Sequence, residues 1–135
     1  MIRVLLLVAA LISCVPRLSH SDEHTPALVQ TPFVAKLHIT APTGISVSPQ
    51  GVVFVSCDIN GVTNTKRNAG KVVRCEDTDG DGRADKCSNF VEGIDSPRGS
   101  CYVDDTLYLM QPPLLVAYQD LDKDGVPEKK TVLVT

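Results

Sequence analysis

Two stretches of the chain repeat each other and decide the fold. The first, residues 71–85, reads KVVRCEDTDGDGRAD, and the second, residues 114–128, reads LLVAYQDLDKDGVPE. In each, a short apolar run leads into an acidic loop, and the loops begin 43 residues apart, at Asp77 and Asp120. A second apolar run follows each loop. Short Val-rich runs separated by turn residues are typical of β-strands, so the sequence predicts the same hairpin twice.

The repeat extends upstream of both hairpins. Pro42-Thr43-Gly44 leads into the apolar run 51–56, and Pro97-Arg98-Gly99 leads into the run 105–110. Each unit therefore holds about four short strands in roughly forty residues, which is the period and content of a propeller blade. The expected strands are 44–47, 52–57, 71–75 and 86–91 in the first unit, and 99–103, 106–110, 114–118 and 130–134 in the second.

These patterns predict an all-β fold, a partial β-propeller of about two four-stranded blades. The blades cover about 42–92 and 97–135 within a folded region that spans 34–135. Nine Gly and nine Pro interrupt the apolar runs, and no long amphipathic pattern is present, which argues against helical bundles, coiled coils and doubly wound nucleotide folds. A ring needs at least about four blades, so we expect either a fragment of a longer propeller or open β edges that need a partner.

The first 21 residues read as a signal peptide. Arg3 precedes a nine-residue apolar run, 4–12, which is too short to cross a bilayer. Cleavage before Cys14 would follow a lipobox and leave that cysteine acylated as a lipid anchor, whereas cleavage before Asp22 would follow an ordinary signal peptidase site. Both predict export, to a periplasmic, membrane-anchored or extracellular location. Residues 22–33 are polar and aperiodic, and we expect a linker there.

Each acidic loop has the spacing of a calcium site, with carboxylates at positions one, three and five, glycine at six and a further acid at nine. An EF-hand also needs a bidentate Glu at position twelve, where this chain has Ser88 and Thr131. We therefore expect Ca²⁺ sites of a β-hairpin kind, the alternative being turns held by Asx hydrogen bonds without metal. Lys123 lowers the charge of the second loop. The predicted ligands are Asp77, Asp79, Asp81, the Arg83 carbonyl and Asp85, and Asp120, Asp122, Asp124, the Val126 carbonyl and Glu128.

Export permits disulfides among the four cysteines that follow the signal peptide. Cys75 and Cys87 lie two residues outside the ends of the first acidic loop. A hairpin would place them opposite each other, about 4.5 to 5.5 Å apart at Cα and within disulfide range. Free thiols are the alternative, because Tyr118 and Lys130 stand at the corresponding places around the second loop. Cys57 and Cys101 carry no comparable indication of a partner.

Other functional signals are sparse. The net charge of −3 argues against nucleic acid as a partner. The folded region has one His and no Ser-His-Asp set, so it shows no catalytic constellation. Arg98 stands where the first repeat has Thr43. It could bind an anionic or polar ligand near a propeller channel, or pair with Asp95 at the surface.

Two blocks of the sequence carry a resemblance to a known family: PTGISVSPQGVVFVSCDINGVTNTKRNAGKVVRCEDTDGDGRADK (42–86) and GIDSPRGSCYVDDTLYLMQPPLLVAYQDLDKDG (93–125). They resemble the N-terminal propeller of large secreted planctomycete-type (PVC) haem-binding or membrane-bound dehydrogenase proteins. The resemblance implies a six-bladed propeller, NHL-like or like quinoprotein glucose dehydrogenase, followed by helical repeats and a cytochrome c module. The C-x-x-C-H haem site of that downstream module is absent from this sequence.

Three functions remain open at this stage. The chain could be a calcium-stabilised propeller segment of a secreted, dehydrogenase-like, haem-associated protein, non-catalytic by itself. It could instead be an extracellular module that binds a carbohydrate, a small molecule or a protein, or an inactive truncated product. The partners expected under the first hypothesis are the remaining propeller blades or a partner β edge. Whether the whole protein is an enzyme stays undecided.

Overall fold

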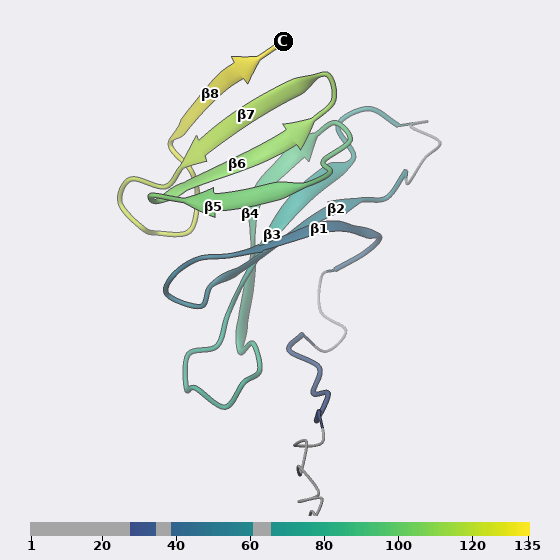
Figure 1. Cartoon of the computed structure of the whole chain (residues 1–135). Coiled ribbons are helices and arrows are strands. Elements are labelled where there is room, and N and C mark those ends of the chain that lie inside the picture. The colour runs from purple at the N-terminus through teal and green to yellow at the C-terminus, as the bar shows by residue number, and fades with distance from the viewer. Residues whose placement is uncertain (1–27, 35–38, 61–65) are drawn as a thin grey trace, which may run out of the picture.

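The regular structure of the described residues is entirely β (Figure 1). The computed structural model describes residues 28–34, 39–60 and 66–135. Over these residues it forms two four-stranded antiparallel sheets, each with its strands in sequence order, and no helix. No membrane-spanning helix is therefore present in the described ranges. Sheet 1 contains β1 (Pro42–Val47), β2 (Val53–Asp58), β3 (Gly70–Glu76) and β4 (Lys86–Ile94), and sheet 2 contains β5 (Ser100–Val103), β6 (Thr106–Gln111), β7 (Leu114–Gln119) and β8 (Lys129–Val134).

The all-β prediction is confirmed, and each of the eight expected strands is present with its ends within three residues of the expected ones. The largest difference is at β4, which continues to Ile94 because its pairing with β3 extends to Gly70. The predicted signal peptide, with Cys14, and the first half of the predicted linker, 22–27, lie outside the described residues.

The two sheets share one irregularity of register. Between β3 and β4, Val72 pairs with Val91 and Val73 pairs with Asn89, which leaves Phe90 as an extra residue. Between β7 and β8, Leu115 pairs with Val134 and Val116 pairs with Val132, so that residue 133 is left over in the same way. The repeat in the sequence is therefore a repeat in the structure, down to its β-bulge.

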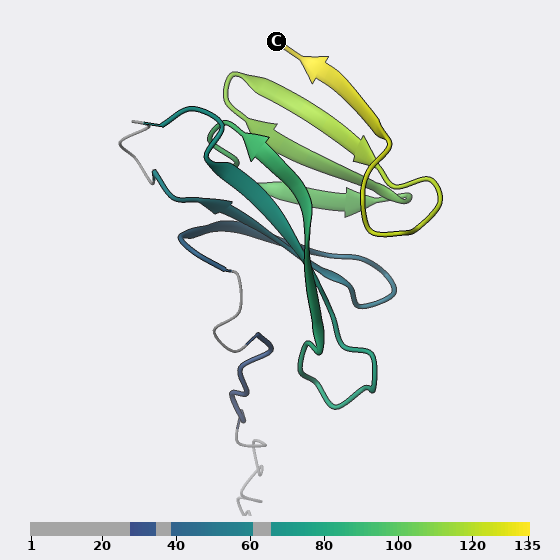
Figure 2. The ribbon, with the colours of Figure 1, turned by 180° about the vertical axis from the view of Figure 1, so that it is seen from behind.

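The sheets pack face to face around one apolar core (Figure 2). Phe54 lies at its centre, edge-on to Phe90 at 5.1 Å between ring centroids and stacked on Tyr102 at 5.0 Å. Such aromatic pairs add to the free energy gained by burying their area. The buried members of this inter-sheet core are Phe54, Val72, Phe90, Ile94, Leu107, Leu109, Val116 and Tyr118.

A second core covers the other face of sheet 1. Its buried members are Val53, Val55, Cys57, Val73 and Cys75. The chain segment that precedes β1 covers them through Phe33, Val34 and Ile39. The backbone N–H of Ala84 donates to the Phe33 carbonyl at 2.8 Å, which fixes this segment to the first acidic loop. The central strands β2 and β3 are consequently buried on both faces, whereas Ile45 and Val47 of β1 stay exposed.

The sheets also meet where β1 approaches the start of β5. Gly44 allows this contact, because a Cβ atom there would lie 2.4 Å from the Arg98 carbonyl oxygen. The Thr43 hydroxyl donates to the Pro97 carbonyl at 2.6 Å, and the hydroxyls of Ser46 and Ser100 lie 3.1 Å apart.

Candidate metal centre

The two acidic loops have the same local structure. In the first, Asp77 accepts hydrogen bonds from the backbone N–H groups of Gly80 and Gly82, at 2.7 and 2.8 Å. In the second, Asp120 accepts one from Gly125 at 2.9 Å. Gly82 and Gly125 have φ of 85° and 96°, a left-handed conformation that favours glycine. The N–H groups of Asp81 and Asp124 donate to the carboxylates two residues earlier, both at 3.1 Å, so the Asx turns that the sequence suggested are present in both loops.

The acid at position nine closes each loop. The backbone N–H and the hydroxyl of Thr78 both donate to Asp85, at 2.8 Å. The N–H of Leu121 donates to Glu128 at 2.6 Å in the second loop. The hydrogen bonds from Thr78, that from its backbone N–H first, lower the pKa of Asp85. Asp85 is consequently an anion at neutral pH, as a metal ligand must be.

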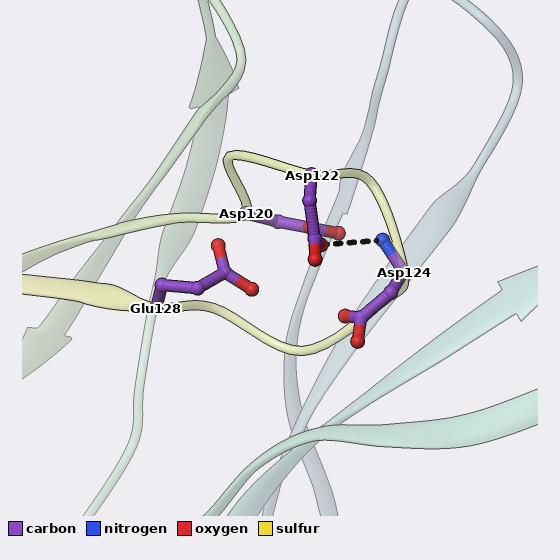
Figure 3. Close-up of side chains that lie close together, drawn as sticks. All are labelled: Asp120, Asp122, Asp124 and Glu128. Carbon is purple, nitrogen blue, oxygen red and sulfur yellow. Dashed lines mark hydrogen bonds between the residues drawn. The ribbon is translucent and has the colours of Figure 1, made fainter.

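The carboxylates converge more completely in the second loop than in the first. Figure 3 shows the four acids of the second loop around its interior, and one ligand oxygen from each lies within 4.8 Å of the others. The first loop gathers three acids in this way and leaves Asp81 out. The Arg83 and Val126 carbonyls stay predicted ligands. The converging acids are Asp120, Asp122, Asp124 and Glu128 in the second loop, and Asp77, Asp79 and Asp85 in the first.

Lys123 does not enter the acidic cluster of the second loop. Its Nζ lies 3.7 Å from the Asp105 carboxylate, and its side chain is 75% exposed. The positive charge of Lys123 is thus directed at Asp105, in the turn between β5 and β6. The lysine amine therefore does not neutralise the four clustered carboxylates from within.

One buried carboxylate oxygen of the second loop lacks a hydrogen-bond partner. Asp120 Oδ1 is buried and has no hydrogen-bond partner. A buried, unpaired carboxylate oxygen is costly, and a bound cation would supply the missing partner. The donor set therefore fits a hard, oxygen-preferring metal ion.

Sheet 1 contributes to the surroundings of the second loop through Arg74. A Cβ atom on Gly125 would lie 3.5 Å from Arg74 Nη1, so the loop rests on the guanidinium group. Arg74 also forms an ion pair with Glu76. Sequence reasoning missed Arg74, because nothing in the run Val-Val-Arg-Cys shows that the arginine meets a loop of the other sheet.

A cavity of about 340 Å³ lies beside the β1–β2 turn, 48–52, and reaches the starts of both acidic loops at Asp77 and Asp120. Phe54, Phe90 and Tyr102 line its apolar side. Its charged lining residues are Arg74, Glu76, Asp77, Asp105, Asp120 and Lys123. It has the mixed apolar and polar lining of a small-molecule site.

Arg98 is placed at the junction of the sheets. Its Nη2 lies 3.3 Å from Oδ2 of Asp58, a residue with no exposed side-chain surface. The partner that the structure describes for Arg98 is therefore Asp58 and not Asp95. Asp95 instead accepts a hydrogen bond from the Asn68 N–H and lies 3.6 Å from Arg67.

Cys75 and Cys87 are paired across the hairpin, as their spacing predicts. Their sulfur atoms lie 2.7 Å apart and both thiols are free, so the disulfide itself stays a prediction. Burial and the neighbouring Cys87 thiol raise the pKa of Cys75 to about 12. Burial also raises the pKa of Cys57, while Cys101 is exposed.

The fold and the site define an all-β protein of two repeated sheets, whose acidic loops could hold a metal ion. The chain belongs to the family described as "Domain of unknown function (DUF7133)", which matches residues 26–135. No curated protein matches the sequence.

Proposed function

We propose that the chain is a calcium-stabilised β-propeller segment of a secreted, dehydrogenase-like, haem-associated protein, and that it is non-catalytic by itself. The observation that carries the proposal is the equivalence of the two acidic loops. Both close through an acid at position nine and gather carboxylates at their centres. The orphaned Asp120 Oδ1 adds a buried acceptor that a cation would satisfy.

Calcium fits these loops better than magnesium. Ca²⁺ accepts six to eight oxygen ligands in irregular geometry, whereas Mg²⁺ requires near-ideal octahedral geometry and gives up its water reluctantly. The loops offer several carboxylate oxygens on a short, exposed turn, which water can complete. The family resemblance implies that haem is bound by a separate cytochrome c module, and this sequence itself has no C-x-x-C-H motif.

Thermal unfolding of the exported protein tests the proposal. We expect millimolar Ca²⁺ to raise Tm. At a hundredfold excess of Ca²⁺ over Kd, the free energy of unfolding should rise by about 2.7 kcal/mol, and Mg²⁺ should have a much smaller effect. Asp120→Asn should weaken the response. Asp104→Asn is the matched control, since this exposed acid lies outside both clusters. An unmoved Tm, or an intact response in Asp120→Asn, would contradict the proposal.

The assignment to a propeller is supported by the two consecutive sheets, which pack face to face and share their register. We propose that they are two neighbouring blades of a six-bladed ring. Export is part of the same proposal, with Cys14 as the lipid-anchored residue or Asp22 as the first residue. Mass spectrometry of the mature N-terminus tests it, because an acylated Cys14 and a free Asp22 differ in mass.

The cavity favours a second function, that of an extracellular carbohydrate- or small-molecule-binding module. The Tyr102 ring could stack on a sugar ring, and Asp105 and Asp120 could accept hydrogen bonds from its hydroxyls. A glycan array on the folded chain tests this function. Binding that Asp105→Asn weakens at unchanged Tm would support it, since Asp105 lines the cavity and is exposed, whereas absence of binding would reject it.

A further inference from the structure

The face of sheet 2 that points away from sheet 1 is apolar and uncovered. Met110 and Leu133 on this face are 41% and 48% exposed. Cys101 is also exposed, and Tyr108 and Leu115 are half-buried. We call the surface formed by these five residues the open face.

The register of the strands shows which residues of sheet 1 correspond to the open face. Phe54 pairs with Arg74, and Tyr108 pairs with Ala117, which lies 43 residues after Arg74. Tyr108 is therefore the counterpart of Phe54. By the same register Leu115 is the counterpart of Val72, and Leu133 in the β-bulge is the counterpart of Phe90.

These counterparts have opposite environments. In sheet 1, Phe54, Val72 and Phe90 are 3%, 0% and 3% exposed, because sheet 2 packs over them. In sheet 2 the equivalent side chains are still aromatic or aliphatic, although no part of the described chain covers them to that extent. The open face thus has the composition of a sheet-to-sheet interface, including the bulge that brings Phe90 into the core.

A glycine supplies independent support. Ser46 pairs with Phe54, and Cys101 pairs with Tyr108, so Gly99 is the counterpart of Gly44. Gly44 is required because a Cβ atom there would lie 2.4 Å from the Arg98 carbonyl oxygen of the next sheet. A Cβ atom on Gly99 would meet nothing within 4 Å. Gly44 therefore makes a close approach that only glycine allows, whereas no atom of the described residues approaches Gly99 in this way.

We propose that the open face docks a third four-stranded sheet of the same repeat, with its first strand against Gly99. This inference rests on the proposal that the two sheets are consecutive propeller blades. The docked sheet would present a face like the one that covers sheet 1, formed by Leu107, Leu109, Val116 and Tyr118.

A second copy of this chain fits the open face less well. Its own face with Leu107 and Tyr118 is already buried against its sheet 1. Over β2 and β3 the remaining face of its sheet 1 is covered by Phe33, Val34 and Ile39. Only the β1 edge of that face is uncovered, so a second copy presents no complete four-stranded face of the required kind.

The experiment extends the full chain by a second copy of residues 93–135 placed after Thr135, with the added cysteine replaced by serine. We expect maleimide labelling of Cys101 to be at least tenfold slower than in the 135-residue chain, with Cys101→Ser as the control for signal from other thiols. Leu133→Lys in the first copy should restore fast labelling. The same substitution should leave the 135-residue chain folded, since Leu133 is half exposed there.

Gly99→Ala provides the second readout. It should be tolerated in the 135-residue chain and should lower the Tm of the extended chain, as Gly44→Ala should lower the Tm of both. Unchanged labelling of Cys101 would overturn the inference, and so would an added repeat that stays unfolded, because the same sequence folds against sheet 1. Dimerisation of the 135-residue chain that Met110→Lys abolishes would also overturn it, in favour of a second copy. The calcium response of the 135-residue chain is measured separately, so a failed docking test and a failed calcium proposal remain distinguishable.

Discussion

Asp58 is completely buried at the end of β2, and its Oδ2 lies 3.3 Å from Arg98 Nη2, at the start of sheet 2. The other oxygen, Oδ1, accepts a hydrogen bond from the Asn60 N–H at 3.0 Å. The ion pair therefore joins the two repeats at the point where β1 and β5 approach each other. Arg98 thus makes a contact between the sheets, and its role in ligand binding stays a prediction.

Removing Arg98 should be costly to stability. Arg98→Ala leaves the Asp58 carboxylate buried without its opposite charge, which typically costs about 3–5 kcal/mol. We expect a loss near the lower end, since the arginine is 35% exposed. Chemical denaturation measures the loss. Arg67→Ala is the control, because its side chain is 91% exposed and its pair with Asp95 should contribute less than about 1 kcal/mol. Equal, small effects of both substitutions would contradict the importance of the buried pair.

Lys123→Ala should increase the calcium affinity of the second loop. The lysine amine lies beside Asp105 at the edge of the cavity that Asp120 also lines. Its removal takes one positive charge from the surroundings of the bound cation, and we expect a twofold to fivefold lower Kd, as is typical of exposed charges. Isothermal titration at two salt concentrations measures the change. An effect that persists undiminished at high salt would not be electrostatic and would contradict this explanation.

The exported protein should contain a Cys75–Cys87 disulfide. The two residues are paired across the hairpin and their sulfurs are in contact at 2.7 Å, so oxidation needs little movement of the backbone. The bond should add about 2–4 kcal/mol to stability. Peptide mapping without reduction identifies it. Cys87→Ser, with Cys101→Ser as the matched control, should abolish the stabilisation by oxidant. Cys75 joined to another cysteine would contradict the prediction.

In the reduced protein, the cysteines should differ in the rate at which they are alkylated at pH 8. With a pKa of about 12, Cys75 is almost entirely a thiol at pH 8, and its thiolate fraction is about one in ten thousand. Exposed Cys101 should therefore react first. Because the folded-state pKa exceeds the usual value near 9, the thiol form stabilises the fold below pH 9, and this stability is lost as the pH rises toward 12. Cys75→Ala should remove that part of the alkaline loss, measured by denaturation at pH 8 and above.

Local patterns were sufficient to predict the strands and the acidic loops. Alternating apolar runs and D-x-D-x-D-G turns depend on neighbours in the sequence, so their positions follow from the sequence directly. The pairing of Cys75 with Cys87 was predictable for the same reason, since it needs only a symmetric hairpin.

Contacts between the sheets were not predictable in this way. Whether Arg98 meets Asp58 or Asp95 depends on how the second sheet is seated on the first, which no local spacing encodes. The position of Arg74 under the second loop has the same origin. The exclusion of Asp81 from the first cluster depends on the direction of one side chain within a turn.

The segment that carries Phe33, Val34 and Ile39 gives the array of repeats a direction. It lies on the face of sheet 1 that corresponds to the face of sheet 2 buried against sheet 1. Further repeats can therefore be added on the open face of sheet 2, whereas on sheet 1 the corresponding position is occupied by Phe33, Val34 and Ile39. Closing the array into a ring would require this segment to leave its place on sheet 1, or to share it with the final blade. The contacts of Phe33, Val34 and Ile39 with sheet 1 would then determine whether the array of repeats stays open or closes.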